Sequence, residues 1–437
     1  MPEIPERCRL AIVGGGAAGL MAAIAAARIW SGRQNQSVSE DPQILILEKM
    51  DRVGRKLLAT GNGRCNISNQ NLSIANYHGQ HPEFAASALK QLSVSDTLAL
   101  FQRIGLRCRT ESEGKIYPFS LQASSVLDIL RLAAAHLAVR TEPSFSVAEL
   151  QPDRTGSRFI LTAADGRKIH AECVIISTGG LAAPAMGCDG SGYKLLTRFG
   201  HRLTATFPAL VQVKTELDLV KGLAGLKFDG TLRVMAGDQC LQTAAGEILF
   251  TDYGLSGPPI LEIARVISQR LRQNQTENIQ IVLDLLPDMA FDELIQWLTF
   301  RRQVDLKLEL SEFLTGLVSK KIGQAILKRC LDRTATLAST VEILDSNMIT
   351  KLAAMLKALP IRAVGTQDWR QAQVTAGGLA TEDFDPDTLE SRLQPGIYAA
   401  GEILDIDGDC GGYNLQWAWS SGYVAGCSAM LACLSNS

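Results

Sequence analysis

The sequence predicts an α/β fold in which both ends of the chain contribute to one parallel sheet. Two stretches near the N-terminus support this fold class: the glycine-rich IVGGGAAGL at 12–20 and the apolar run QILILEK at 43–49. A third, AECVIISTGG at 171–180, again ends an apolar strand in glycines. Continuous apolar strands are typical of parallel sheets that are covered on both faces. With 437 residues, the chain has room for two or three domains.

The first stretch also fits a signal peptide or a membrane anchor, because Arg7 and Arg9 precede a long, mostly apolar segment. Three glycines would weaken such an apolar helix by about 1 kcal/mol each relative to alanine. A strand-turn-helix unit needs them instead. We therefore predict a strand at 9–13, a turn at 14–19 and a helix at 20–30.

The spacing Gly14-x-Gly16-x-x-Gly19 has the form of a dinucleotide-binding turn. Its glycines allow a tight turn, a close approach of the pyrophosphate and close packing of helix on strand. The second strand then ends at Glu48, whose carboxylate can accept hydrogen bonds from ribose hydroxyls. The interval between turn and carboxylate is longer than the usual ~20 residues, and we assign the excess to a polar loop at 31–42.

The composition excludes several classes of protein. The formal charge of -2 gives no general argument for nucleic acid or anionic membrane as a partner. The ten cysteines form no C-x-x-C pair and show no metal-binding spacing with the five histidines. They are typical of reduced, mostly buried thiols, so we expect a cytoplasmic protein without a metal site and without a membrane partner.

Features of a nucleotide site return near the C-terminus. PGIYAAGE at 395–402 is another strand that runs into a glycine, and Gly411 and Gly412 precede a helix that begins near Asn414. The N-terminus of that helix would direct free N–H groups and a partial positive charge at a ligand. A flavin fits this arrangement, with its adenosine end at the first turn and its pyrimidine edge at the last helix. We therefore expect FAD.

Three longer motifs carry a resemblance to a known family. GRKLLATGNGRCNISN at 54–69, FTDYGLSGPPIL at 250–261 and AAGEILDIDGDCGGYNLQWAWSSGYVAG at 399–426 resemble the signatures of the BaiN/RdsA-like NAD(P)/FAD-dependent oxidoreductases. They occur in the expected order and span essentially the whole chain. Two departures are the long loop before Glu48 and the tyrosine at 253, where some relatives are expected to have histidine.

The resemblance implies a three-part architecture. A glutathione-reductase-type, Rossmann-like FAD-binding domain would comprise 1–200 and 373–437. A small β-barrel domain would be inserted in it at 201–286 and 360–372, and a helical domain at 287–359 would be nested in the barrel.

The residue pattern is consistent with this layout. Short strands with alternating polarity or glycine turns are predicted at 209–216, 231–237 and 247–254. Apolar residues recur at helical spacing from 285 to about 359. In SGPPI, we expect Ser256 to cap a helix whose first turn contains the two prolines.

The chemistry is expected on GNGRCN at 61–66. Its glycines let the backbone lie against a flat ring, Arg64 and Asn66 offer donors, and Cys65 offers a thiol. If the enzyme reduces an activated double bond, Cys65 could donate a proton. Arg64 beside it could favour the thiolate or an anionic substrate. The alternative for Cys65 is a buried, inert cysteine.

Other residues are assigned to FAD itself. The helix N-terminus at 414–416 would stabilise the negative charge of reduced flavin, whereas Trp417 and Trp419 are expected to pack within the protein. Arg55 and Lys56 would reach the pyrophosphate or lie in solvent. The expected FAD contacts are Gly14, Gly16, Ala17, Ala18, Gly19, Glu48, Lys49, Arg55, Lys56, Gly61, Asn62, Gly63, Arg64, Val147, Thr178, Gly179, Gly180, Gly401, Glu402, Gly411, Gly412, Asn414, Leu415 and Gln416.

The expected function is an FAD-dependent oxidoreductase that is reduced by NAD(P)H and passes hydride to an acceptor such as an activated double bond. The sequence has one dinucleotide fingerprint, so NAD(P)H would visit the flavin transiently. The resemblance implies several reactions: dihydrouridine formation in ribosomal RNA, reduction in steroid metabolism, and amine or aminoketone oxidation with oxygen. A non-catalytic flavin-binding partner of RNA or protein is a further alternative.

The substrate can therefore be a small molecule or ribosomal RNA. Local charge bears on this choice, because the expected helical insert has five basic residues against one acidic residue, Asp332, between 315 and 333. Such a face could contact phosphates, although a solvated helix face has the same composition. The basic residues are Lys320, Lys321, Lys328, Arg329 and Arg333.

Overall fold

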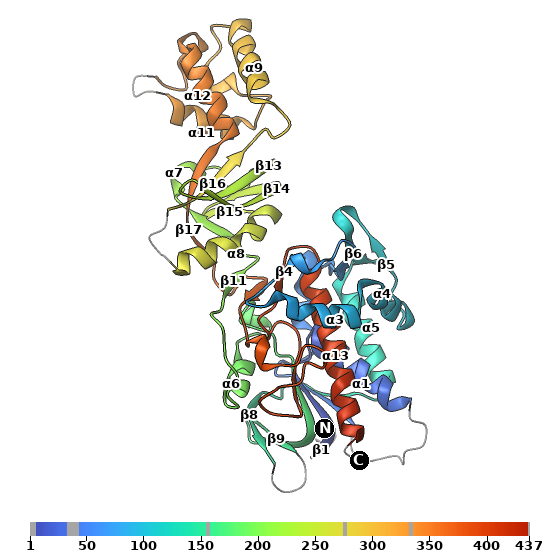
Figure 1. Cartoon of the computed structure of the whole chain (residues 1–437). Helices are drawn as coiled ribbons and strands as arrows, with labels where there is room; N and C mark the ends of the chain where they lie inside the picture. Colours follow the sequence, from blue (N-terminus) through green and yellow to red (C-terminus); the bar gives the residue numbers. More distant parts are fainter. Residues whose placement is uncertain (1–5, 33–42, 154–157, 274–277, 332–334, 436–437) are drawn as a thin grey trace. The chain divides into compact units, whose positions relative to one another are not determined.

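The protein is represented by a computed structural model that describes residues 6–32, 43–153, 158–273, 278–331 and 335–435 (Figure 1). The chain divides into two compact units. The first consists of Met1–Pro208 and Ala372–Ser437, and the second of Ala209–Gln371. Most of the polar loop predicted at 31–42 lies outside the described residues.

The first unit is built on a sheet with a parallel centre. Strands β7, β2, β1, β10 and β19 are parallel neighbours, and β9 and β8 extend the sheet as antiparallel strands beside the first half of β10. The strands are β1 (Arg7–Val13), β2 (Ile44–Leu47), β7 (Arg140–Glu142), β8 (Val147–Pro152), β9 (Phe159–Ala163), β10 (Lys168–Ile176) and β19 (Ile397–Ala399).

The apolar runs of the sequence form the interior of this sheet, as predicted. All four residues of β2 are buried, and so are the last four of β1. Helix α1 (Ala17–Ser31) begins three residues earlier than predicted, directly after Gly16. Alanine has the highest helix propensity, so Ala17 and Ala18 extend the helix as soon as the glycine turn ends.

The two ends of the chain meet through α1 and α13 (Tyr413–Ser435), which lie side by side (Figure 1). Gly422 and Gly426 of α13 face the backbone of α1. A Cβ atom at Gly422 would lie 2.3 Å from the carbonyl oxygen of Ala18, and one at Gly426 would lie 2.2 Å from that of Ala22. Only glycine permits this approach, which fixes the C-terminal helix on the nucleotide-binding unit.

Smaller elements surround the sheet of the first unit. The helices are α2 (Arg55–Ala59), α3 (Ala85–Gln91), α4 (Val94–Arg103), α5 (Ala123–His136) and α6 (Ser191–Thr197). The short strands are β3 (Ser68–Asn69), β4 (Tyr77–His78), β5 (Cys108–Thr110), β6 (Lys115–Pro118), β11 (Phe207–Ala209), β18 (Val374–Ala376) and β20 (Asp407–Gly408). They pair as a three-stranded sheet β3-β6-β5 and as the pairs β4–β20 and β11–β18.

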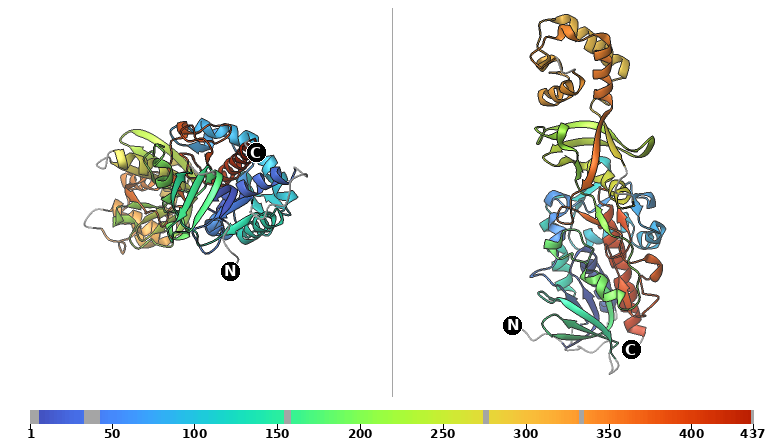
Figure 2. Two further views of the ribbon diagram at one scale, coloured as in Figure 1. Left: turned by 90° about the horizontal axis from the view of Figure 1, so that it is seen from below. Right: turned by 90° about the vertical axis from the view of Figure 1, so that its left-hand side faces the viewer.

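The second unit contains a closed barrel in the order β12-β15-β14-β13-β16-β17. Its strands are β12 (Val213–Thr215), β13 (Lys227–Ala236), β14 (Gln239–Thr251), β15 (Gly254–Ser256), β16 (Ile279–Asp284) and β17 (Leu359–Thr366). Four helices join β16 to β17 and lie beyond one end of the barrel (Figure 2). The helices of this unit are α7 (Leu217–Val220), α8 (Pro258–Gln273), α9 (Phe291–Val304), α10 (Leu310–Phe313), α11 (Lys320–Cys330) and α12 (Ser346–Lys357).

These observations confirm the predicted fold class: a Rossmann-type α/β unit, an inserted barrel and a helical segment nested in the barrel. The exact boundaries of the three domains stay a prediction. Residues 201–208, which were assigned to the barrel, belong to the first unit. His201 explains this placement, since its ring hydrogen-bonds to Leu196 and Ser391 of that unit.

The predicted cap at Ser256 is wrong. Ser256 is the last residue of β15, and Gly257 takes the position before α8, where its carbonyl oxygen accepts from the N–H groups of Ile260 and Leu261. Gly257 has φ +106°, and a Cβ there would lie 2.3 Å from the carbonyl oxygen of Glu247. The close approach to β14 therefore selects glycine rather than a capping side chain.

Three further expectations concern the whole chain. Within the described residues, no helix is long and apolar enough to cross a membrane. All ten cysteines are free, and six are buried. The described part of the chain has no cluster of three or more histidine, cysteine or acidic side chains that could hold a metal ion.

The contact between α1 and α13 leads to a stability prediction. Gly422→Val or Gly426→Val places a branched side chain against the backbone of α1, and such overpacking costs about 1–3 kcal/mol. Denaturant unfolding should show this loss of free energy for either variant. Leu431→Val is the matched control, because Leu431 lies on the same helix and is 49% exposed. Equal stability of the glycine variants and the control would contradict the packing argument.

Candidate nucleotide and flavin site

The predicted nucleotide residues lie at one edge of the parallel sheet. Strands β1, β2, β10 and β19 run in the same direction, so their carboxyl ends meet at this edge. The residues that follow them are Gly14, Glu48, Ser177 and Ala400. In open α/β sheets, ligands bind in the crevice outside the carboxyl ends of the strands.

The first turn has the geometry that its glycines predict. Gly14 has φ +102°, and a Cβ there would lie 2.6 Å from the carbonyl oxygen of Ser177. A Cβ at Gly19 would lie 2.0 Å from the carbonyl oxygen of Gly14, so helix and turn touch. At Gly16, by contrast, no atom lies within 4 Å of an added Cβ. This open space lies at the N-terminus of α1, where free N–H groups favour an anion.

Glu48 is held beside this turn. Its carboxylate accepts from the N–H groups of Gly15 and Met50, each at 2.8 Å, and the residue is buried. A carboxylate has about four acceptor positions, so capacity is left for ribose hydroxyls. Val147 lies near, because the N–H of Phe145, two residues before it, donates to the carbonyl oxygen of Glu48.

The predicted basic contacts outside the loop at 61–66 already have acidic partners. Lys49 pairs with Asp189, and Arg55 pairs with Asp51 at 3.4 Å on the surface. Lys56 lies 2.6 Å from Glu402, which also accepts from the N–H of Thr375. Burial acts to lower the pKa of Lys56, but the adjacent Glu402 carboxylate outweighs it and the pKa is raised. Lys56 and Glu402, which are both predicted FAD contacts, therefore pair with each other.

The turns after β10 and β19 are closely packed. Gly180 faces Thr375, whose hydroxyl accepts from the N–H groups of Leu181 and Ala182. Thr178 and Gly179 form the start of the turn after β10, and Gly179 has φ +71°. Gly401 has φ +79°, and a Cβ there would lie 2.9 Å from the Cβ of Ala18. The structure therefore brings these turns to the first turn of the chain.

The loop at 61–66 has an unusual backbone. Gly61 and Asn62 have φ of +56° and +55°, Gly63 has +83°, and Cys65 has +58°. A left-handed conformation is uncommon for residues other than glycine and often marks a functional site. No atom lies within 4 Å of an added Cβ at Gly63. The loop therefore has a strained backbone with an open face.

Arg64 is fixed beside this loop. One of its terminal nitrogens lies 2.6 Å from Glu111, and its guanidinium lies 4.3 Å from the ring centroid of Tyr117. Glu111 also pairs with Arg109 at 2.7 Å, and the side chain of Arg64 is 40% exposed. The pKa of Glu111 is lowered, mainly by the hydrogen bond from Arg64. Arg64 is thus held in a defined position.

Cys65 does not have the properties of an exposed proton donor. Its exposed fraction is zero, and burial raises the pKa of its thiol to about 12. The thiolate suggested by the neighbouring Arg64 is therefore wrong, since the guanidinium pairs with Glu111 instead. The structure favours the alternative of a buried cysteine.

The loop meets the N-terminus of α13. A Cβ at Gly412 would lie 2.4 Å from the carbonyl oxygen of Ser68 and 2.9 Å from Oδ1 of Asn66. The Nδ2 of Asn69 donates to the carbonyl oxygen of Gly411 at 3.0 Å. Among the described residues, Oδ1 of Asn66 is buried and has no hydrogen-bond partner. Loop and helix terminus therefore form one junction that contains an unpaired acceptor.

Two side chains of the predicted helix terminus have structural partners. The amide of Asn414 bonds with the backbone of Gly408 and Asp409. Gln416 is fully buried, donates to Leu92 and Thr97, and accepts from Ser68. These side chains fix the helix, so a ligand would meet the first-turn N–H groups near Asn414 and Leu415, which lack partners within the helix.

The two tryptophans pack in the interior, as predicted. Trp417 and Trp419 are 1% and 0% exposed. Their ring nitrogens donate to the carbonyl oxygens of Gly401 and Ile67, respectively. Trp417 thereby ties α13 to the turn after β19, and Trp419 ties it to the segment that follows the loop at 61–66.

Sequence reasoning missed several residues that shape the site. The hydroxyl of Ser177 donates to the carbonyl oxygen of Gly14 at 2.9 Å, and the hydroxyl of Thr375 holds the turn after Gly180. Glu111 fixes Arg64 from 47 residues away. Ser177 directly precedes Thr178, a predicted FAD contact, so its position in the sequence could have indicated a role in the site. Thr375 and Glu111 lie far in the sequence from the residues that they hold, and no local pattern indicated their roles.

Three features of the described structure suit the binding of FAD. The space at Gly16 lies before a helix N-terminus, which suits a pyrophosphate. The Glu48 carboxylate lies beside that turn, which suits a ribose. The unpaired Oδ1 of Asn66 lies at the junction with α13, which suits the N–H at the pyrimidine edge of a flavin.

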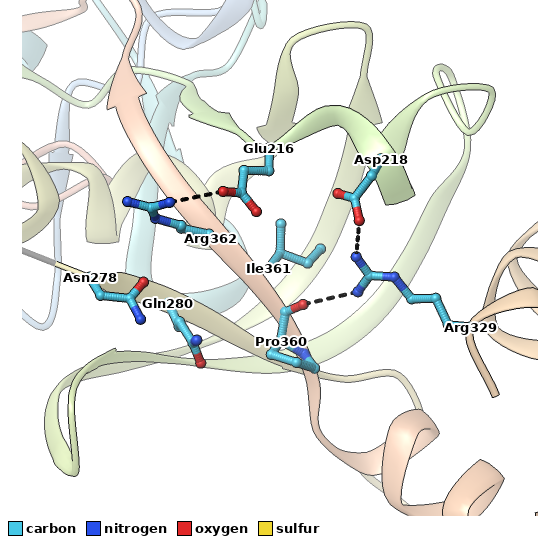
Figure 3. A pocket seen from close by; sticks show the side chains of 8 residues that line it. All are labelled: Glu216, Asp218, Asn278, Gln280, Arg329, Pro360, Ile361 and Arg362. Atoms are coloured by element: carbon cyan, nitrogen blue, oxygen red, sulfur yellow. Dashed lines mark hydrogen bonds and ion pairs between the residues drawn. The ribbon is translucent and has the colours of Figure 1, made fainter.

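Two cavities lie in the second unit. One has a volume of about 530 Å³ and a polar lining, in which Arg362 pairs with Glu216 at 3.0 Å and Arg329 pairs with Asp218 (Figure 3). The other has a volume of about 360 Å³ and lies between β13 and the segment before α11. Neither is lined by the glycine turns, so both are separate from the predicted nucleotide site.

The model of the HI0933-like protein Rossmann domain family matches residues 8–428. The chain belongs to this family. Its relatives include a 3-dehydro-bile acid delta(4,6)-reductase from Clostridium scindens, 38% identical over 96% of this chain and 98% of the relative. They also include a ribosomal RNA dihydrouridine synthase from Haemophilus influenzae, 28% identical over 95% of this chain and 97% of the relative.

A solved structure of 3-ketosteroid delta1-dehydrogenase from Sterolibacterium denitrificans aligns with 98% of this chain and 100% of its own, at 12% identity and a TM-score of 0.48. The family match and the two relatives confirm the resemblance to the BaiN/RdsA-like oxidoreductases. This member of the HI0933-like family is an FAD-dependent oxidoreductase. Its individual FAD contacts stay predictions.

Replacing Glu48 should weaken FAD binding. Glu48→Gln keeps the shape of the side chain but removes its charge, and a hydrogen bond to a charged group contributes about 1.5–3 kcal/mol. The Kd for FAD, measured by flavin fluorescence, should rise by at least about tenfold. The matched control is Glu142→Gln on the neighbouring strand β7, where the carboxylate pairs with Arg140. Unchanged flavin occupancy in Glu48→Gln would place the ribose elsewhere.

Cys65 should be inert in the folded protein. Iodoacetamide should modify the exposed Cys240 in the native state but reach Cys65 only after unfolding, as mass spectrometry would show.

Because the folded pKa of Cys65 lies above its ordinary value, its contribution to stability is present below pH 9 and is lost as the pH rises towards 12. Cys65→Ala should cost about 1 kcal/mol of stability. Loss of substrate-dependent flavin reoxidation, with stability unchanged, would restore the proton-donor hypothesis.

Proposed function

We propose that this enzyme takes electrons from NAD(P)H through FAD and reduces a carbon–carbon double bond conjugated to a carbonyl group in a small molecule. One observation carries the proposal. The loop at 61–66, with its fixed Arg64, meets the N-terminus of α13. Two independent sources of positive potential therefore lie at the end of the site where the flavin ring is expected.

This arrangement suits the charge that develops during such a reduction. Bound FAD supplies a carrier that takes a hydride from NAD(P)H and gives it to the double bond. One carbon would gain the hydride and the electron pair of the double bond would move towards the carbonyl oxygen. A proton from solvent water would then add to the other carbon, because Cys65 is buried. Arg64 can donate to that oxygen, and preorganised donors of this kind stabilise developing negative charge.

The first turn of α13 would stabilise negative charge on the flavin. When negative charge is added to the flavin, a helix N-terminus beside its pyrimidine edge favours the charged form. Gly411 and Gly412, with φ of +134° and +102°, bring the backbone close to the loop without side chains between them. Tyr413, Trp417 and Trp419 are buried, so the N–H groups of Asn414 and Leu415 are the expected means of contact at this end of α13.

The comparisons support a double bond as the acceptor. The bile acid relative is named as a delta(4,6)-reductase, and the RNA relatives are named as dihydrouridine synthases. Both names describe the saturation of a carbon–carbon double bond. The relative that acts on a small molecule is 38% identical to this chain and the RNA enzymes are 28% identical, which favours a small molecule.

The charges of the helical insert favour the same choice. Lys320 pairs with Glu312, and Arg329 pairs with Asp218. Lys321 and Lys328 are exposed and have no acidic partner in the described part of the chain, while Arg333 and Asp332 lie outside it. With half of the described basic residues neutralised, the proposed phosphate-binding face loses much of its charge. Ribosomal RNA stays the second candidate because of the two RNA enzymes.

The deciding experiment follows the two half-reactions separately. FAD-loaded protein is reduced anaerobically with NADPH or NADH in a stopped-flow instrument and then mixed with a conjugated enone, an unmodified ribosomal RNA fragment, or an amine with oxygen. The proposal predicts that NADPH or NADH bleaches the flavin absorbance and that the enone rapidly reoxidises the reduced flavin. Reoxidation by RNA alone, or electron uptake from an amine followed by reoxidation with oxygen, would contradict it.

The RNA alternative has its own control. Lys321→Glu with Lys328→Glu should leave the flavin spectrum and the enone reaction unchanged, since both residues lie in the second unit. If RNA is the substrate, each lost phosphate contact should lower the slope of log affinity against log salt by about 1. An unchanged slope in this double variant would remove the insert from any RNA interface.

A further inference from the structure

One face of the sheet β3-β6-β5 carries a cluster of arginine and aromatic side chains, here called the arginine–aromatic face. Its members on β5, β6 and their ends are Arg107, Arg109, Tyr117 and Phe119. Arg109 is opposite Tyr117 in the antiparallel register, and the N–H of Phe119 donates to the carbonyl oxygen of Arg107. Side chains two residues apart on a strand share a face, so the four lie on the same side.

The other side of this sheet faces the interior. Ile116 is 1% exposed and Pro118 is buried, whereas Phe119 is 59% exposed. The Phe119 ring is therefore accessible to a ligand. Two arginines flank it, since the guanidinium carbons of Arg107 and Arg109 lie 5.5 and 5.9 Å from its centroid. Exposed aromatic and arginine side chains together are typical of surfaces that recognise ligands.

The face is continuous with the loop at 61–66. Arg64 of that loop lies over the Tyr117 ring, and a Cβ at Gly61 would be 3.6 Å from Cε1 of the same ring. From Tyr117, the face extends by two residues to Phe119. A ligand that lies on Phe119 can therefore extend along one strand towards the junction of loop and α13.

The charges on the face are unevenly paired. Glu111 accepts from both Arg64 and Arg109, and Lys115 pairs with Glu113. Arg107 has no acidic partner in the described part of the chain. The Nε of Arg109 is buried and unpaired there as well. The net positive charge is thus concentrated around Phe119, where an anion would meet it.

We propose that the arginine–aromatic face binds the adenosine 2′-phosphate end of NADPH. The base would stack on Phe119, and Arg107, with Arg109 beside it, would bind the phosphate. This inference rests on the proposed function in one respect, because it assumes a nicotinamide electron donor. It adds the binding site of that donor and a preference for NADPH over NADH.

The chemistry of the face selects this ligand class. Guanidinium groups match phosphate oxygens in geometry and charge, and nucleotide bases stack on exposed aromatic rings. The sequence has one dinucleotide turn, at 14–19, and Glu48 marks it for FAD. A second dinucleotide must therefore bind outside the parallel sheet. The arginine–aromatic face is small and lies beside two carboxylates, those of Glu111 and Glu113, which disfavours a long polyanion such as RNA.

The test measures binding directly. Calorimetric titration of FAD-loaded protein compares 2′,5′-ADP, the adenosine end of NADPH, with AMP, which has no 2′-phosphate. Arg107→Ala should weaken 2′,5′-ADP binding by about 10- to 100-fold and leave AMP nearly unchanged. Phe119→Ala should weaken both by about tenfold, and Phe119→Trp should restore binding to within about threefold.

Matched controls keep the result interpretable. Arg131→Ala removes an exposed arginine of α5 that pairs with Asp128 and lies outside the arginine–aromatic face. It should bind both ligands like the parent. Circular dichroism and the flavin spectrum check that each variant is folded and loaded. The KM for NADPH should follow the calorimetric Kd in Arg107→Ala, while kcat with saturating NADPH should stay within about threefold of the parent.

Three outcomes overturn the inference: equal affinity for 2′,5′-ADP and AMP in the parent, parent-like binding by Arg107→Ala and Phe119→Ala, or binding of single-stranded RNA on this face without binding of 2′,5′-ADP. Failure of the proposed function is distinguishable from these. It would appear as a parent flavin that neither NADPH nor NADH reduces, whatever the calorimetry shows.

Discussion

The contact between the first and last helices is the constraint on which the site depends. Gly422 and Gly426 let α13 approach the carbonyl oxygens of Ala18 and Ala22, far closer than any side chain would permit. Gly401 fits beside Ala18 in the same region, and Trp417 hydrogen-bonds to its carbonyl oxygen. These contacts hold the C-terminal helix against the nucleotide turn, so two segments about 400 residues apart form one site.

The parallel sheet supplies the second part of the arrangement. Because neighbouring strands run in one direction, every turn after a strand lies at the same edge, and each brings a different function there. The turn after β1 offers free N–H groups, and the end of β2 offers the Glu48 carboxylate. The turn after β10 supports the first of these turns, because the hydroxyl of Ser177 donates to the carbonyl oxygen of Gly14. Rigid strands thus position groups that the loops alone would leave mobile.

Buried polar side chains fix the segments at the expected flavin end of the site. Gln416 is fully buried and has hydrogen-bond partners on three other segments through Leu92, Thr97 and Ser68. A buried amide is tolerated only when its donors and acceptors are paired, so this network fixes the N-terminus of α13. The strained loop at 61–66 is held against it, and Arg64 is in turn held by Glu111 and Tyr117. The hydrogen bonds and ion pairs therefore hold the loop, Arg64 and the first turn of α13 in fixed positions, as the proposed reaction would require.

The sequence by itself determined the fold class, the parallel strands and the nucleotide turn, because each depends on local patterns: apolar runs, glycine spacing and a carboxylate at a strand end. It also placed the two tryptophans in the interior. The ion-pair partners of the charged side chains could not be predicted. Lys56 and Glu402, for example, lie 346 residues apart, and only the folded chain pairs them. For the same reason, the burial of Cys65 and the capture of Arg64 by Glu111 were decided by tertiary structure: exposure and pKa depend on neighbours from distant segments, which no local pattern specifies.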